Sequence, residues 1–125
     1  MAGEYINDEV FDQGLDYADT NGTRIDITSQ VATSRTEAIT TYTLGNDTVN
    51  TGTTEAGAID GRRVIVPAIT VGSVTGTDTA THWALTSGSE LLATGPLTGG
   101  GQAVTSGNTF SLDAISITLR DATVT

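Results

Sequence analysis

Residues that could carry out chemistry are few in this sequence. His82 is the single histidine, and the chain contains no cysteine and no lysine. A serine–histidine–aspartate triad would have to use His82, which lies within an expected strand beside Trp83, with no nucleophile motif near it. One histidine without cysteine disfavours a transition-metal site. We therefore predict that His82 is a strand-face side chain with a local hydrogen bond.

The absence of lysine excludes further reactions. Schiff-base chemistry and a lysine base require that side chain. The glycine triplet at 99–101 cannot act as a phosphate-binding loop, because no lysine follows it. The sequence thus predicts no nucleotide site and no cofactor.

Carboxylates are the most abundant reactive groups. Acidic pairs such as Asp8 with Glu9, or Asp12 with Asp16, could in principle act as the two carboxylates of a glycosidase. All four lie in an expected surface helix, where carboxylates are usually solvated charge. We predict the solvated role and no enzymatic activity.

The segment 16–26, DYADTNGTRID, has some features of a calcium loop. Aligning Gly22 with the glycine that such a loop requires puts Asp19 and Asn21 at ligand positions. The same alignment puts Tyr17 at the position of the first carboxylate ligand and Thr28 at the position of the bidentate glutamate. Two of the required carboxylate ligands are therefore missing. We predict instead a helix end at Asn21-Gly22, with the glycine in the left-handed conformation, and no metal.

Bulk properties narrow the class of protein. The length of 125 residues is typical of one domain. The net charge of −10, from 15 acidic residues against five arginines, argues against nucleic-acid binding. No apolar run approaches the roughly 20 residues that span a bilayer. The start, MAGEYINDEV, does not resemble a signal peptide, so we expect synthesis in the cytoplasm without secretion by the general pathway.

Hydrophobic patterning predicts a mainly β fold: a single antiparallel β-sandwich or barrel-like domain with one short N-terminal helix. The helix is expected at 8–20, and the strands at 24–28, 38–44, 62–71, 80–86, 90–94, 102–105 and 109–119. A hairpin turn is predicted at 87–89. A change of hydrophobic phase in the last strand predicts a β-bulge near Asp113-Ala114.

Three regions are candidates for contact with partners. The apolar helix face needs a sheet or a partner to lie on, because Gly14 weakens the helix. The segment 45–61 reads as a long polar loop, a common place for binding. The pair Arg62 and Arg63 starts a strand and should point to opposite faces, where one side chain could pair with a partner's carboxylate. The candidate contact residues are Val10, Phe11, Leu15, Arg62, Arg63, Asn46 and Asp47.

Trp83 is the strongest anchor of the chain. A strand position with Leu85 on the same face predicts a core side chain, with an interface or a ligand platform as the alternative. The hydrophobic content of 37% with only 5% aromatic residues indicates a thin core. A domain of this kind gains stability when it is covered by partner subunits.

Three motifs resemble a known group of proteins. RRVIVPAIT at 62–70 is followed by GSVTGTDTATHWALTSGSELLATGPLTGGGQAVTSGNTFSLDAISITLRDA, which contains a Trp strand, a Leu-Leu-Ala-Thr-Gly return strand and a Ser-Gly-Asn-Thr-Phe turn into the last strand. SRTEAITTYTLG at 34–45 belongs to the same pattern. Together with the N-terminal helix, they make most of the chain similar to small structural virion proteins of tailed bacteriophages and prophages.

The resemblance implies a virion component without enzymatic activity, cofactor or metal. The first expectation is a capsid decoration (cement) protein that binds the outer shell and stabilises the major capsid protein, as a homo-oligomer such as a trimer. The alternative is a tail, tip or fibre component that contacts a host receptor or glycan. A third possibility, of a different class, is a small carbohydrate-active or peptidoglycan-degrading enzyme. Neither nucleic acid nor membrane is an expected partner, and the expected location is the virion.

Overall fold

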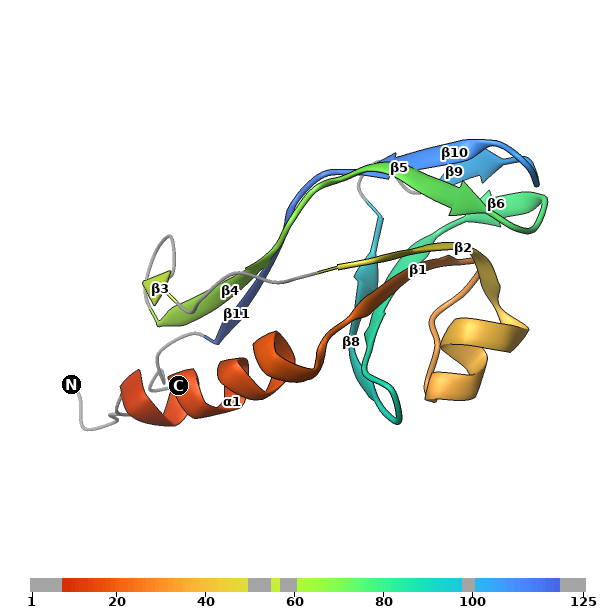
Figure 1. Cartoon of the computed structure of the whole chain (residues 1–125). Helices are drawn as coiled ribbons and strands as arrows, with labels where there is room; N and C mark the ends of the chain where they lie inside the picture. Colours follow the sequence, from red (N-terminus) through yellow and green to blue (C-terminus); the bar gives the residue numbers. More distant parts are fainter. Residues whose placement is uncertain (1–7, 50–54, 57–60, 98–100, 120–125) are drawn as a thin grey trace, which may run out of the picture.

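The computed structural model describes residues 8–49, 55–56, 61–97 and 101–119, with side chains except at 8–12 and 55–56. The fold is mainly β, with antiparallel sheets, one N-terminal helix and no closed barrel (Figure 1). The largest sheet has six strands in the order β10 (Thr109–Leu112), β5 (Ile69–Val74), β2 (Thr43–Thr48), β1 (Arg24–Thr28), β7 (His82–Thr86) and β8 (Leu91–Pro96). A three-stranded sheet contains β11 (Ile115–Leu119), β4 (Arg62–Val66) and β3 (Glu55–Ala56), and a two-stranded sheet contains β6 (Asp78–Ala80) and β9 (Gln102–Val104).

The core lies on one face of the central strands β1 and β7. Ile25 and Ile27 of β1 are buried there together with Trp83 and Leu85 of β7, at most 9% exposed. Alternation along β1 and β7 puts these four side chains on the same face, because successive residues of a strand point to opposite sides. The prediction that Trp83 is a core residue is confirmed.

The opposite face of the same strands carries small side chains. Ala84 of β7 packs there with Ala32 and with Ala38 of a π-helical turn, η1 (Glu37–Thr41). All three alanines are at most 3% exposed. Their small size lets the turn approach the sheet closely, so both faces of the central strands are covered.

The turn η1 corrects the predicted strand 38–44. The Glu37 amide donates to Ser34 Oγ at 3.2 Å, and the Glu37 carboxylate accepts from the amide and hydroxyl of Thr33 at 2.8 and 2.7 Å. These bonds to Thr33 lower the pKa of Glu37. They satisfy amides at the start of a helical turn, a capping arrangement that outweighs the β-propensity of the following residues. The strand therefore begins only at Thr43.

Two predicted strands, 62–71 and 109–119, are each interrupted, and the interruptions face each other. β4 pairs with β11 up to Val66↔Ile115, and β5 pairs with β10 from Ile69↔Leu112. Between them lie Pro67-Ala68 and Asp113-Ala114, outside any strand. Pro67 has no amide to donate, which explains why the ladder stops there. The two strand pairs continue as one bent ribbon that leaves the large sheet (Figure 1).

The predicted bulge at Asp113-Ala114 is therefore an interruption of the strand. The register shift lies earlier, between Phe110 and Leu112 of β10, and the additional residue belongs to β5. The prediction that the five apolar residues of both halves share one side is nevertheless correct for four of them. Phe110 belongs to the main core, and Leu112, Ile115 and Ile117 pack against it, whereas Leu119 is exposed.

Smaller differences concern the other strands. The predicted strand 80–86 divides at Thr81 into β6 and β7. The predicted hairpin is confirmed, since β7 pairs with β8 and the Ser87 amide donates to the Glu90 carbonyl at 2.9 Å. The predicted strands 90–94 and 102–105 correspond to β8 and β9. The predicted loop 45–61 is shorter than expected, because β2 continues through Thr48. Its parts at 50–54 and 57–60 lie outside the described residues. Residues 98–100, which include two glycines of the triplet, also lie outside them.

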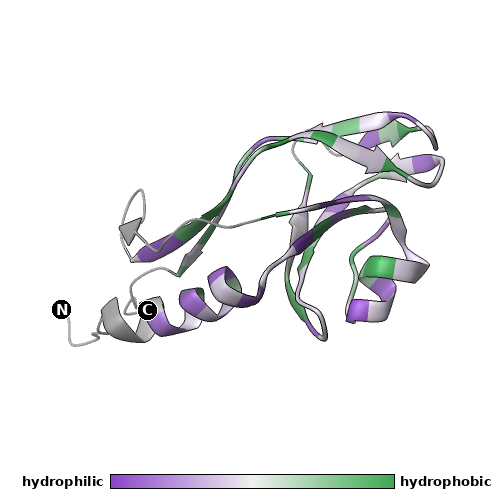
Figure 2. Cartoon of the chain, in the orientation of Figure 1, coloured by the Kyte–Doolittle hydropathy of each residue, from purple (hydrophilic) through white to green (hydrophobic). Residues whose placement is uncertain are grey.

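Helix α1 (Asp8–Asn21) packs against β4, the middle strand of the three-stranded sheet, and runs beneath that sheet in Figure 1. Its described outer residues are mostly hydrophilic (Figure 2). The helix ends with the Gly22 amide donating to the Ala18 carbonyl at 2.7 Å. Gly22 does not have a positive φ, contrary to the prediction. A Cβ at this position would lie 2.6 Å from the Ala18 oxygen and 3.0 Å from Leu85, so the glycine is required for space. None of the helices in the described part of the chain is long and apolar enough to cross a membrane.

Candidate functional site

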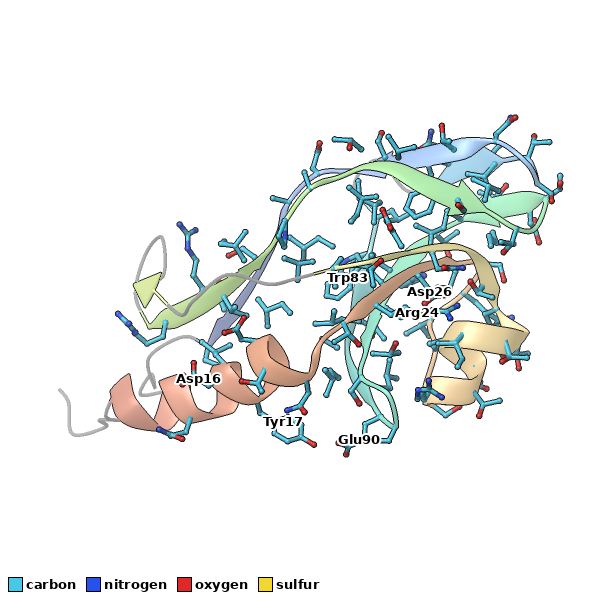
Figure 3. All side chains as sticks on the ribbon, in the orientation of Figure 1. Asp16, Tyr17, Arg24, Asp26, Trp83 and Glu90 are labelled. Carbon is cyan, nitrogen blue, oxygen red and sulfur yellow. The ribbon has the colours of Figure 1, made fainter. Side chains whose placement is uncertain are left out.

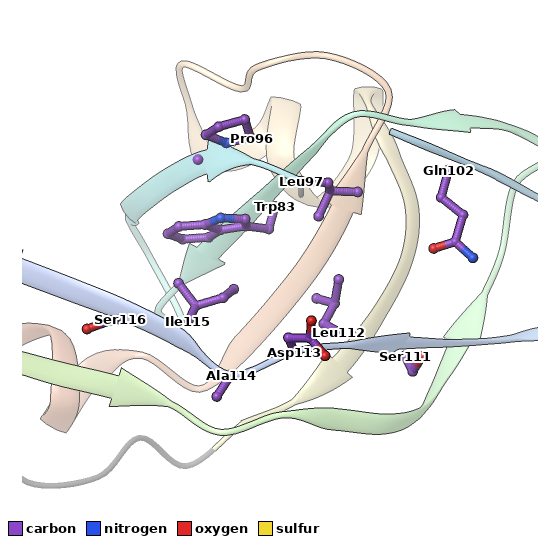
Figure 4. Close-up of a pocket in the computed structure, with 11 residues that line it drawn as sticks. Trp83, Pro96, Leu97, Gln102, Ser111, Leu112, Asp113, Ala114, Ile115 and Ser116 are labelled. Carbon is purple, nitrogen blue, oxygen red and sulfur yellow. The ribbon is translucent and has the colours of Figure 1, made fainter. Parts of the chain in front are cut away.

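A cleft of about 490 Å³ opens between the end of β8 and the corner where β10 meets β11 (Figure 4). We call it the β8–β11 cleft. Residues 95–97 and Trp83 form one wall, residues 111–116 form the other, and Gln102 lies at one end. The bend of the ribbon at Asp113-Ala114 creates the space, because β11 turns away from the large sheet there.

The cleft is partly apolar and carries one ionisable group. Trp83 and Leu97 lie across from Leu112 and Ile115, and all four belong to the core or pack against it. The polar lining consists of Gln102, Ser111, Asp113 and Ser116. Asp113 is exposed, and no arginine or histidine lines the cleft. About half of the lining surface is polar, so the cleft offers both apolar contacts and hydrogen-bonding groups to a bound molecule.

Among the side chains that the structure describes, one carboxylate is buried, that of Asp26 in β1 (Figure 3). It is 0% exposed and accepts two hydrogen bonds from Arg24, at 2.7 and 2.9 Å. The Thr43 hydroxyl donates a third, at 2.6 Å. The hydrogen bonds from Arg24 to Asp26 raise the pKa of that arginine, against the opposing effect of burial. All these donors point at one carboxylate, so Asp26 ties β1 to β2 through Thr43 and holds the Arg24 side chain in place.

A second polar contact joins the helix to the β7–β8 hairpin. The Tyr17 hydroxyl donates to the Glu90 carboxylate, across 73 residues of sequence (Figure 3). This hydrogen bond and the negative charge of Glu90 raise the pKa of Tyr17. Both residues are exposed, so the contact fixes the position of the helix end and encloses no site.

His82 lies at the start of β7 and is half-buried. Its Nδ1 is 2.8 Å from the Thr81 hydroxyl, the local hydrogen bond that the sequence predicted. Among the described residues, no three histidine, aspartate or glutamate side chains are grouped closely enough to hold a metal ion. The residues 16–26 form the helix end and β1, where Asn21 donates to the Tyr17 carbonyl at 2.8 Å.

The predicted contact residues lie in three separate places. Asn46 and Asp47 are in β2, a central strand paired on both sides, which corrects their assignment to a loop. The Asp47 carboxylate accepts from the amide of Thr48 at 2.8 Å. Arg62 and Arg63 start β4, half-buried, and each already interacts with another group of the chain.

The helix supplies the remaining predicted contacts. Leu15 is only 3% exposed, so its side chain is buried by its own chain and offers little surface to a partner. Val10 and Phe11 lie in α1, but their side chains are outside the described residues. Helix docking on the chain's own β4 explains the burial of Leu15.

The structure brings none of these predicted contacts to the β8–β11 cleft. Sequence reasoning recognised Trp83 but missed Gln102, Ser111 and Asp113. The available signal was the change of hydrophobic phase at Asp113-Ala114, which predicts a bulge. The same change of phase is also compatible with a corner at which the strand leaves its sheet, and this is what the structure has.

Comparison of the chain with protein-family models, with curated proteins and with solved structures found no match. The functional argument therefore depends on the residues and on the geometry described above.

Proposed function

We propose that this chain is a structural component of a phage virion, most simply a decoration protein that binds the outer capsid shell and stabilises the coat subunits. The sequence motifs at 34–45 and 62–122 support the proposal through their resemblance to structural proteins of tailed phages. The geometry supports a role in assembly independently of that resemblance.

The observation that carries the proposal is an incompletely covered core. Apolar side chains of β8, β10 and β11, and of the residue that follows β8, pack against the main core but remain half-buried: Leu92, Leu97, Leu112, Ile115 and Ile117. Three of them, Leu97, Leu112 and Ile115, line the β8–β11 cleft. Core residues of a self-sufficient domain are usually covered on all sides. Apolar surface left open in this way is typical of a chain that is completed by a partner.

The polar groups of the described residues support the same role. The buried carboxylate is held by Arg24 and Thr43, and His82 is bonded to its neighbour. These groups stabilise the scaffold. Val71 of β5, at 68% exposure, is a further apolar side chain that the described chain leaves uncovered.

Copy number on purified particles tests the proposal. We expect quantitative mass spectrometry to find hundreds of copies per virion, and particles from a phage lacking the coding sequence to lose DNA at a lower temperature. A handful of copies, with intact heads that fail to adsorb, would support the tail or fibre alternative. Absence from the particle would exclude a structural virion role.

A single variant refines this test. Val71→Asp places a charge on the exposed valine of β5 and should reduce occupancy on particles lacking the protein, if that surface meets the shell. Thr70→Asp, at the neighbouring exposed position, is the matched control. Equal occupancy of wild type and both variants would place the shell contact elsewhere on the molecule.

A further inference from the structure

The β8–β11 cleft lies between free strand edges. In the described part of the chain, β8 pairs only with β7, β10 only with β5, and β11 only with β4. Asp113 and Ala114, at the corner, belong to no ladder. At the β8 wall, Pro96 has no amide and the Leu97 amide already donates to the Thr81 carbonyl at 2.9 Å. The backbone groups that an added extended segment can use are therefore those of the opposite wall, at the edges of β10 and β11 and at the corner between them.

The cleft can also receive an apolar side chain. Trp83 and Leu97 on one side, and Ile115 on the other, surround space that no described side chain fills (Figure 4). The volume of about 490 Å³ is within the range of ligand pockets, about 300–1,000 Å³. Ala114, on the opposite wall, carries only a methyl group.

Charge indicates what kind of segment fits. Asp113 is the single ionisable group of the lining, and the whole chain has a net charge of −10. Acidic occupants are disfavoured at such a surface, and a basic side chain beside Asp113 gains an ion pair. Neighbouring residues of an extended peptide point to opposite sides, so one apolar and one basic residue can alternate between the two walls.

We propose that the β8–β11 cleft binds an extended peptide segment of a partner protein, with an apolar side chain against Trp83 and a basic side chain beside Asp113. In the virion this segment would belong to a coat subunit, so the identity of the partner rests on the proposed function. The binding itself is a property of the isolated chain and is tested separately.

A second copy of this chain is a less suitable occupant. Of its five arginines, Arg120 lies outside the described residues, and Arg24 and Arg35 already bond to Asp26 and to the Ser87 carbonyl. Arg62 and Arg63 lie in β4 and interact within the chain. The acidic charge of the second copy would also oppose self-association at Asp113.

Trp83 provides a direct measurement, because it is the only tryptophan of the chain and lines the cleft. We would titrate the full chain with a blocked hexapeptide of alternating valine and lysine, and record tryptophan fluorescence. A saturable change is expected. The matching valine–glutamate peptide should bind at least about tenfold more weakly, because it places carboxylates beside Asp113.

Two pairs of variants locate the binding. Asp113→Lys and Ala114→Phe, both at exposed positions, should weaken binding of the valine–lysine peptide at least about fivefold, by reversing the charge and by filling the entrance. The controls Asp78→Lys and Ala103→Phe, at exposed positions of β6 and β9 outside the cleft lining, should bind like wild type. Circular dichroism checks that each variant is folded.

Three results would overturn the inference. These are no saturable change with the valine–lysine peptide, equal affinity for the valine–glutamate peptide, and equal weakening by cleft and control variants. A fourth such result could come from sedimentation of the chain alone. If the wild type is a dimer and Ala114→Phe is a monomer, the occupant of the cleft is a second copy of this chain. Peptide binding by a protein absent from particles would instead refute the virion role and leave the cleft assignment standing.

Discussion

The indole of Trp83 in β7 lies directly against the backbone of Gly95 in β8, its cross-strand partner in the ladder. A Cβ at position 95 would be 2.7 Å from Nε1 and from Cζ2 of the ring. The contact holds the indole at the wall of the β8–β11 cleft, so the core and the candidate site share one side chain.

Gly95→Ala should therefore destabilise the fold. The added methyl group must displace the indole or the strand, which typically costs about 1–3 kcal/mol of unfolding free energy. Urea unfolding followed by Trp83 fluorescence measures the loss. Gly88→Ala in the hairpin turn is the control, because no atom lies within 4 Å of its added Cβ and its φ is not positive. Equal stability of both variants would mean that the indole contact is loose.

Asp26→Asn should destabilise the fold strongly. The substitution removes the negative charge that Arg24 and Thr43 share, and leaves a half-buried guanidinium without its anion. Breaking a buried pair in this way costs about 3 kcal/mol, at the lower end of the usual range because Arg24 is a third exposed. Chemical denaturation checks the value. Asp47→Asn in the adjacent strand should change stability by less than about 0.5 kcal/mol, and a similar loss there would contradict a special role for Asp26.

Thr86→Val should preserve or increase stability. The Thr86 hydroxyl is buried and has no hydrogen-bond partner in the structure, and valine has nearly the same shape. Removing an unsatisfied buried polar atom recovers part of its desolvation penalty, about 1 kcal/mol. Thr28→Val is the matched control, because the equally buried Thr28 hydroxyl donates to the Gln30 carbonyl at 2.8 Å. We expect that variant to lose about 1 kcal/mol. A loss in both variants would indicate a hidden partner for Thr86.

The contact between Tyr17 and Glu90 should respond to alkaline pH. Hydrogen bonding to Glu90 raises the pKa of Tyr17 in the folded state above its ordinary value of 10.0. The folded state thus favours the protonated phenol, so the contribution to stability is complete below pH 10 and is lost as the pH rises through the folded pKa. Thermal unfolding of wild type and Tyr17→Phe should differ at neutral pH and converge above that range. A constant difference across the whole range would show that the hydrogen bond does not contribute.

The same measurement on Glu90→Gln separates the two causes of the shift. The amide keeps an acceptor oxygen but removes the negative charge that opposes ionisation of the phenol. The alkaline loss of stability should therefore begin at a lower pH than in wild type. An unchanged profile would assign the pH dependence to another group.

Much of the architecture follows from local patterns in the sequence. The helix at the N-terminus, the strand 24–28 and the hairpin around Ser87 all appear where they were predicted, because each depends on nearby residues: a helical face, an alternating run and turn formers. Trp83 and Leu85 were correctly assigned to the core face for the same reason. The turn η1 could also have been predicted, since Ser34 and Glu37 have the spacing of a capping box before an apolar pair.

The candidate site could not be predicted in this way. The β8–β11 cleft joins Trp83 and Gly95 with residues 111–116 and Gln102, which come from four segments of the chain. These segments meet because the strand pairing is interrupted at Asp113-Ala114, opposite Pro67. That interruption is visible only from the pairing of β4 with β11, which joins residues far apart in the sequence. For Asn46 and Asp47 the sequence predicted a loop, because polar residues of this kind are typical of loops. In the structure they lie in β2, a central strand that pairs with β1 on one side and β5 on the other.

The sequence by itself determined the class of the fold, the absence of lysine and cysteine chemistry, and the acidic charge. These properties depend on composition and on the spacing of neighbouring residues. Tertiary structure alone decided that Asp26 is buried between Arg24 and Thr43, that Leu15 is covered by its own chain, and that the core stays open at Asp113. Burial and strand pairing are set by segments far apart in the chain, and a local pattern carries no information about which distant edge remains free.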